Sequence, residues 1–94
     1  MSRYLEDRSE PSYVNIIGPV LMELALAEIE GLIEKEGRPP TTIRMTEKER
    51  YAAMGTAFRG ASIGYEQNGQ GFSLIWGVPV VVDEQDSLLA RARQ

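Results

Sequence analysis

The fold class is decided by the stretch Val20-Leu21-Met22-Glu23-Leu24-Ala25-Leu26-Ala27-Glu28-Ile29-Glu30-Gly31-Leu32-Ile33. Its apolar residues recur at i, i+3 and i+4, which is the spacing of one buried stripe on a helix. Pro19 suits the first turn of such a helix, because the N–H that it lacks has no helical partner there. Gly37 and Pro39-Pro40 end the pattern. We therefore expect a long helix over residues 19–36.

The segment before this helix is polar. Residues 1–12 mix charges of both signs and end in Glu10-Pro11-Ser12. Chain ends of this composition become ordered only when something ties them down. We expect a flexible N-terminal arm over residues 1–12 that is ordered only by a partner, with a frayed terminus as the simpler alternative.

The segment after the helix predicts a strand followed by a second helix. Residues 41–45 alternate and contain β-branched side chains, which favours a short strand. Thr46-Glu47-Lys48-Glu49 is a capping box, in which the Thr46 hydroxyl accepts a hydrogen bond from the Glu49 amide and the Glu49 side chain reaches back. We expect a short helix over residues 47–54 and then a loop over residues 55–62.

The C-terminal third predicts a hairpin and a further strand. Asn68-Gly69 lies between residues 63–67 and residues 71–76, and Asn-Gly is favoured in a type I′ turn because both central residues need a positive φ. The glycines nearby also permit a wider, flexible loop. Residues 78–82 read as another strand, and residues 87–94 as a last helical turn or two.

These elements make one α+β domain over residues 13–94, in which a small mixed or antiparallel sheet packs against the long and the short helix. A chain of 94 residues has room for one domain with a thin core, which self-association would strengthen. The expected core combines the helical stripe with inward residues of the other elements: Leu21, Ala25, Ile29, Leu32, Ile43, Met45, Tyr51, Met54, Leu74, Trp76, Val80 and Val82.

The composition excludes several kinds of chemistry. The chain contains no cysteine and no histidine, which rules out disulfides, cysteine nucleophiles, the usual general base and most zinc sites. A formal net charge of -4 disfavours wholesale binding of phosphates, and no run reaches the ~18 apolar residues of a membrane span. We therefore expect no catalytic activity, cofactor or metal, no membrane contact and no nucleic-acid partner.

Three clusters of charged residues are candidate sites, and each has a simpler explanation. Glu23, Glu30 and Glu34 share one helix face, which is typical of a solvated surface rather than of an acid–base pair. The acidic run over residues 83–86 lacks the alternating ligands of a calcium loop. Four basic residues favour a local contact at most, because aromatic residues do not interleave with them. They are Arg44, Lys48, Arg50 and Arg59.

Trp76 is the sole tryptophan and has two interpretations. The first is a half-buried anchor at the end of the sheet, with its indole N–H bonded to a carbonyl. The second is an anchor of a protein–protein interface, because tryptophan is enriched in binding hot spots.

The order of these segments resembles the axial domain of tailed-phage major capsid proteins, the fold shared with encapsulins. In that family a helix leads into a strand, a short helix with an aromatic residue, a loop, and a stretch of the type Gly-x-Pro-Val-Val. The resemblance covers about residues 20–82, and these residues match: Ile43, Met45, Thr46, Tyr51, Leu74, Gly77, Pro79, Val80 and Val81. Glu47 stands where the family often has proline. The family's extended loop, spine helix and peripheral domain have no counterpart in 94 residues.

The resemblance implies a non-enzymatic structural protein of a phage or prophage, an accessory or minor head component that works through protein–protein contacts. Its partners would be further copies or capsid and virion proteins, in the virion and, during synthesis, in the cytoplasm of the host bacterium. The alternative is a small acidic inhibitor or regulator of a host enzyme or nuclease complex. The expected interface residues are Arg59, Tyr65, Gln67, Asn68, Gln70 and Phe72.

Overall fold

The computed structural model describes residues 2–58 and 63–93, with side chains from Tyr13 onward. Its elements follow in the order α1 (Ser2–Glu36), β1 (Ile43–Met45), α2 (Glu47–Phe58), β2 (Tyr65–Gln67), β3 (Ser73–Ile75), β4 (Val78–Val82) and α3 (Leu88–Ala92). The strands form one sheet in the order β1-β4-β3-β2, with β1 parallel to β4 and the other neighbours antiparallel. The expected α+β class, with a long helix packed on a small mixed sheet, is confirmed.

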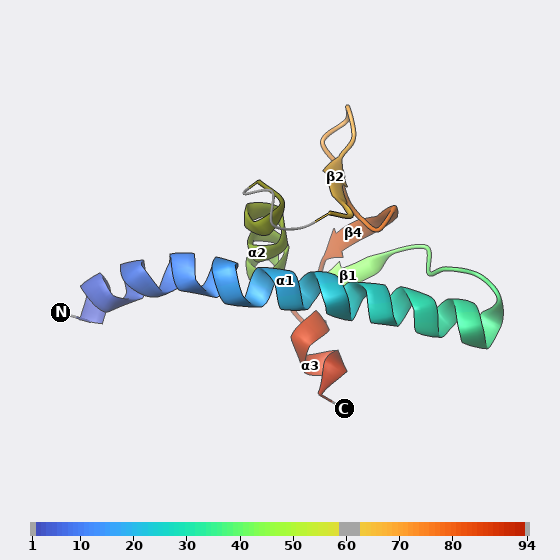
Figure 1. Cartoon of the computed structure of the whole chain (residues 1–94), viewed down its shortest axis with the longest axis horizontal. Helices are drawn as coiled ribbons and strands as arrows, with labels where there is room; N and C mark the ends of the chain where they lie inside the picture. The colour runs from blue at the N-terminus through green and yellow to red at the C-terminus, as the bar shows by residue number, and fades with distance from the viewer. Residues whose placement is uncertain (1, 59–62, 94) are drawn as a thin grey trace.

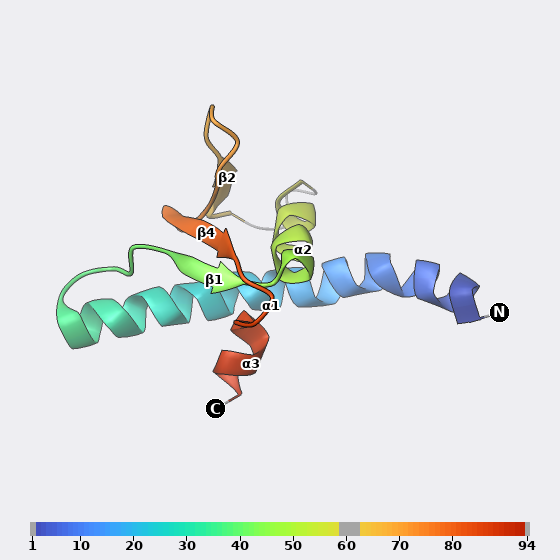
Figure 2. The ribbon, with the colours of Figure 1, turned by 180° about the vertical axis from the view of Figure 1, so that it is seen from behind.

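Helix α1 runs the length of the molecule, and the other elements pack against its middle and C-terminal parts (Figure 1). The helix α2 and the sheet stand on one side of the α1 axis, and α3 lies on the other, as the view from behind also shows (Figure 2). The N-terminal end of α1 stands clear of these elements.

The long helix begins at Ser2 rather than near residue 19. Pro19 therefore lies inside α1, and so does the segment 2–12 that we expected to form an arm. The helix continues upstream of Pro19 because Val14 is buried against α2, so the added turns gain apolar contacts. That a partner orders residues 1–12 stays a prediction.

The crossing of α1 and α2 is close and uses small residues. A Cβ added at Gly18 would lie 1.6 Å from Thr56 Oγ1 and 2.7 Å from Ala52 O, so only glycine fits there. Thr56 Oγ1 donates to Ala52 O or Val14 O, each 3.1 Å away. This contact extends α2 to Phe58, so the prediction of a loop from residue 55 was wrong.

The core follows much of the predicted helical stripe but differs on α2 and in the sheet. Tyr51 and Val82, both expected inside, are 53% and 42% exposed. Three further residues expected inside are only half-buried and lie outside the core cluster: Leu32, Met54 and Leu74. Ala52 and Ala53 are buried instead, because the close approach of α1 leaves no room for a large side chain on that face of α2. The buried apolar residues are Val14, Leu21, Met22, Ala25, Ile29, Ile43, Met45, Ala52, Ala53, Ile75, Val78 and Leu88.

Two tight turns shape the sheet, and the type I′ turn is not where we predicted it. Between β2 and β3, Gly71 N donates to Asn68 O at 3.0 Å and only Gly71 has a positive φ, of 86°. This geometry corresponds to a type I turn closed by a glycine bulge. The link between β3 and β4 is Trp76-Gly77, with φ values of 53° and 81°, as a two-residue type I′ hairpin requires.

Candidate interaction surface

The hairpin of β2 and β3 carries five of the six residues predicted at an interface. Gln67, Asn68, Gln70 and Phe72 are exposed near its tip. Phe72 is 60% exposed, although it is a large apolar side chain. Tyr65 lies at the base of the hairpin and is half-buried. The sixth residue, Arg59, lies outside the described residues.

The hairpin residues do not form one patch, because neighbouring strand residues point to opposite faces of a sheet. Tyr65 and Gln67 face the same way as Ser73 and Ile75, their partners across the strand pair. Phe72 precedes Ser73 and so faces the other side. The predicted interface is thus divided between two faces of the hairpin.

Asn68 stabilises the loop at the tip of the hairpin. Its Oδ1 accepts hydrogen bonds from Gln70 N at 2.9 Å and from Phe72 N at 3.1 Å. A side-chain oxygen that bonds the backbone two residues ahead forms an Asx turn, which holds the loop in one conformation. Asn68 therefore fixes the direction in which Phe72 leaves the loop.

A polar network holds the base of the hairpin against α2. Tyr65 Oη and Ser73 Oγ lie 2.8 Å apart, and Arg50 Nη1 donates to the same Ser73 oxygen at 3.3 Å. Arg50 Nε also donates to Glu47 Oε2 at 2.8 Å. The hydrogen bond with Glu47 raises the pKa of Arg50 and lowers that of Glu47. The role of this network is structural, since each of its side chains already has a hydrogen-bond partner within it.

A shallow hollow of about 220 Å³ lies between the end of α2 and β2. Phe58, which is 84% exposed, stands beside it. Sequence reasoning missed Phe58 because it ended the helix at residue 54. The signal was the spacing of Met54, Ala57 and Phe58, which continues the helical period by i+3 and i+4. The hollow is lined by Met54, Ala57, Phe58, Tyr65, Glu66 and Gln67.

Trp76 has the geometry of a half-buried anchor at the end of the sheet, the first of its two interpretations. It is half-buried, and its indole Nε1 donates to Met22 O of α1 at 2.9 Å. The bond joins the β3–β4 turn to the long helix. A large side chain in the left-handed region is uncommon, so the position is held by the contacts around it.

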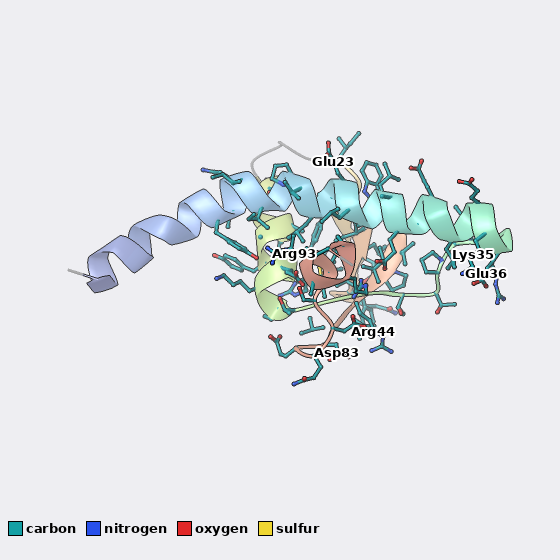
Figure 3. All side chains as sticks on the ribbon, turned by 90° about the horizontal axis from the view of Figure 1, so that it is seen from below. Glu23, Lys35, Glu36, Arg44, Asp83 and Arg93 are labelled. Atoms are coloured by element: carbon teal, nitrogen blue, oxygen red, sulfur yellow. The ribbon has the colours of Figure 1, made fainter. Side chains whose placement is uncertain are left out.

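The charged clusters have ordinary surroundings. Glu23, Glu30 and Glu34 are exposed, and Glu23 points away from the packed elements (Figure 3). Arg44 Nη1 lies 3.3 Å from Asp83 Oδ2. Among the side chains that the structure describes, those of residues 13–58 and 63–93, no group of three acidic residues is placed to hold a metal ion.

Glu49 is the polar residue whose role the sequence revealed only in part. Its side chain is buried, and its Oε1 accepts from Thr46 N at 2.8 Å, while Glu49 N donates to Thr46 Oγ1 at 3.2 Å, which confirms the capping box. The same carboxylate also accepts hydrogen bonds from Leu88 N at 3.1 Å, Leu89 N at 3.0 Å and Ser87 Oγ at 2.7 Å. Glu49 therefore ties the start of α2 to the start of α3.

The protonation of Glu49 follows from these bonds. Burial alone would raise the pKa of its carboxyl group, but the hydrogen bonds from Leu89, Thr46, Ser87 and Leu88 outweigh burial and lower the pKa below its ordinary value. Glu49 is therefore ionised at neutral pH. Its hydrogen bonds are all internal, so its role is structural.

Among the described residues, no helix is both long and apolar enough to cross a membrane. Comparisons of the chain with family models, with curated proteins and with solved structures gave no match.

Proposed function

We propose that this protein is a non-enzymatic accessory or minor head component of a phage or prophage, similar to a capsid axial domain, and that it acts through protein–protein contacts of its β2–β3 hairpin. The observation that carries the proposal is Phe72, which is 60% exposed beside a loop that Asn68 holds in place. Aromatic residues, phenylalanine included, are enriched at protein–protein interfaces relative to the rest of a protein surface.

The sequence resemblance supports the choice of partner. Residues 74–81, which carry much of the resemblance, span parts of β3 and β4 and the turn between them. The proposed partners are capsid or virion proteins, or further copies of this chain. The proposed locations are the virion and, during synthesis, the cytoplasm of the host bacterium.

The test is sedimentation of the purified protein with heads isolated from the strain that encodes it. Wild-type protein should move with the heads, and Phe72→Ala should lower its affinity about tenfold, which corresponds to about 1.4 kcal/mol. Tyr51→Ala is the matched control, because Tyr51 is an aromatic residue exposed to a similar degree on α2. Wild-type protein that stays at the top of the gradient would contradict the proposal.

A second candidate function is inhibition of a host enzyme or nuclease complex by the acidic face of α1. The exposed residues Glu23, Glu30 and Glu34 favour it, because they present negative charge along one side of a helix. A variant of the acidic face distinguishes the two functions. Replacing these three residues by glutamine should abolish such inhibition and leave head binding unchanged.

A further inference from the structure

The two edges of the sheet differ. The strand order places β1 and β2 at the edges. At β1, Arg91 Nη2 donates to Arg44 O at 2.8 Å, so a side chain covers that edge. At β2, no backbone group of Tyr65 or Gln67 bonds a described residue on the outer side.

The register shows which backbone groups face outward. Trp76 N donates to Gly64 O, and Asn68 N donates to Phe72 O at 3.1 Å. Hydrogen-bonded pairs alternate with non-bonded pairs in an antiparallel ladder, so the groups of Glu66 also face β3. The N–H and C=O groups of Tyr65 and Gln67 therefore point away from the sheet. Two donors and two acceptors at this spacing are what an added strand takes up.

The hollow beside α2 lies along the same edge. It is lined by Phe58 and Met54 from α2 and by Tyr65 and Gln67 from β2. A strand paired with β2 directs every second side chain to one face of the sheet. The residues that pair with Tyr65 and Gln67 would thus point to the α2 side, toward a hollow whose lining is mostly apolar.

The negative charge of Glu66 indicates which kind of strand can pair with the β2 edge. If β2 of a second copy paired antiparallel in matching register, Glu66 would face Glu66 of that copy, and like charges directly opposite each other destabilise a strand pair. A lysine or arginine opposite Glu66 would be attracted instead. The edge therefore favours a segment of another protein with the pattern apolar–basic–apolar.

We propose that the β2 edge binds an extended apolar–basic–apolar segment of a partner protein by strand addition, with an apolar side chain in the hollow beside Phe58. The inference rests on the proposed function for the partner's being a virion protein, but the edge and the hollow do not depend on that identity. Strand addition takes affinity from backbone hydrogen bonds and specificity from the pocket.

The test is NMR titration of the full chain with an acetylated, amidated heptapeptide in which lysine alternates with valine and leucine. The amides of Tyr65 and Gln67 should shift and become protected from hydrogen exchange, while the Glu66 amide, already bonded to β3, should change little. Gln67→Pro removes one outward N–H and should weaken binding about tenfold. Gln67→Ala keeps that N–H and should bind within about threefold of wild type.

A peptide control makes the result independent of how the variants fold. N-methylation of alternate peptide amides keeps the charges and side chains but prevents pairing, so binding should be lost. Equal binding by the methylated peptide would overturn strand addition, and so would a dimer of the wild type that Gln67→Pro abolishes. If heads bind the wild type and Gln67→Pro equally while Phe72→Ala fails, the proposed function stands and this inference falls.

Discussion

At the residue scale, Glu49 is the most informative side chain. It is a buried carboxylate that holds the N-terminal ends of α2 and α3, so it couples elements far apart in the sequence. Negative charge at the start of a helix is favourable, and hydrogen bonds to a charged group contribute about 1.5–3 kcal/mol each.

We expect Glu49→Gln to lower the free energy of unfolding by about 2–4 kcal/mol at pH 7, because the amide loses the charge and one acceptor. Urea denaturation followed by the fluorescence of Trp76 measures this loss. Glu34→Gln on the exposed face of α1 is the control and should change stability by less than about 0.5 kcal/mol. Similar midpoints for the two variants would refute the role given to Glu49.

The pH dependence follows from the lowered pKa of Glu49. A carboxyl group whose pKa is lower in the folded state stabilises the protein above its unfolded pKa, and this contribution disappears as the pH falls through the folded pKa. The difference between the wild type and Glu49→Gln should therefore be constant above about pH 5 and shrink below it. Urea midpoints between pH 7 and pH 3 test this, and a difference that grew on acidification would be inconsistent with it.

At the element scale, the close crossing of α1 and α2 determines the shape of the domain. Gly18→Ala should destabilise the fold by about 1–3 kcal/mol, because its Cβ would overlap Thr56 Oγ1 and crowd Ala52 O. Gly31→Ala on the same helix is the matched control and should stabilise by about 0.5–1 kcal/mol, because a Cβ there meets open space. Thermal unfolding of both variants tests the pair. A tolerated Gly18→Ala would contradict the crossing.

The β2–β3 turn gives a second paired test. Gly71 has a φ of 86°, so Gly71→Ala should cost about 1–2 kcal/mol. Gly69 has no positive φ, so Gly69→Ala should be nearly neutral. The type I′ turn that Asn68-Gly69 suggests would need both central residues in the left-handed region. A larger loss at Gly69 than at Gly71, measured by urea denaturation, would favour that turn.

The sequence predicted the elements better than their limits. The helical stripe, the four strands and the capping box follow from local patterns, which is why they were correct. The spacing of Met54, Ala57 and Phe58 indicates the extension of α2, but the extension of α1 before Pro19 depends on contacts with α2, and no local pattern contains that information. The link from Glu49 to Leu88 was hidden for the same reason.

The candidate surface was predictable in part. Asn68-Gly69 correctly marked a hairpin, and Phe72, which we expected at an interface, is exposed on it; its role in binding stays a prediction. The division of the hairpin residues into two faces depends on the register with β3, and the exposed edge of β2 depends on the order of the strands. Both are properties of the assembled sheet rather than of any one segment.

At the scale of the whole molecule, the N-terminal end of α1 stands clear of the other elements. Removing residues 1–11 should therefore change the free energy of unfolding by less than about 1 kcal/mol, since a helix end without packing adds little stability. Urea denaturation of the shortened chain measures this. Loss of cooperative unfolding would show that the segment belongs to the folded core.

The proposed function places the contact with virion proteins on the β2–β3 hairpin. Hydrogen exchange with mass spectrometry, on free protein and on protein bound to purified heads, tests it most directly. We expect added protection in peptides from residues 63–76 and none in peptides from residues 20–36. Protection confined to residues 20–36, or no change anywhere in the chain on adding heads, would contradict it.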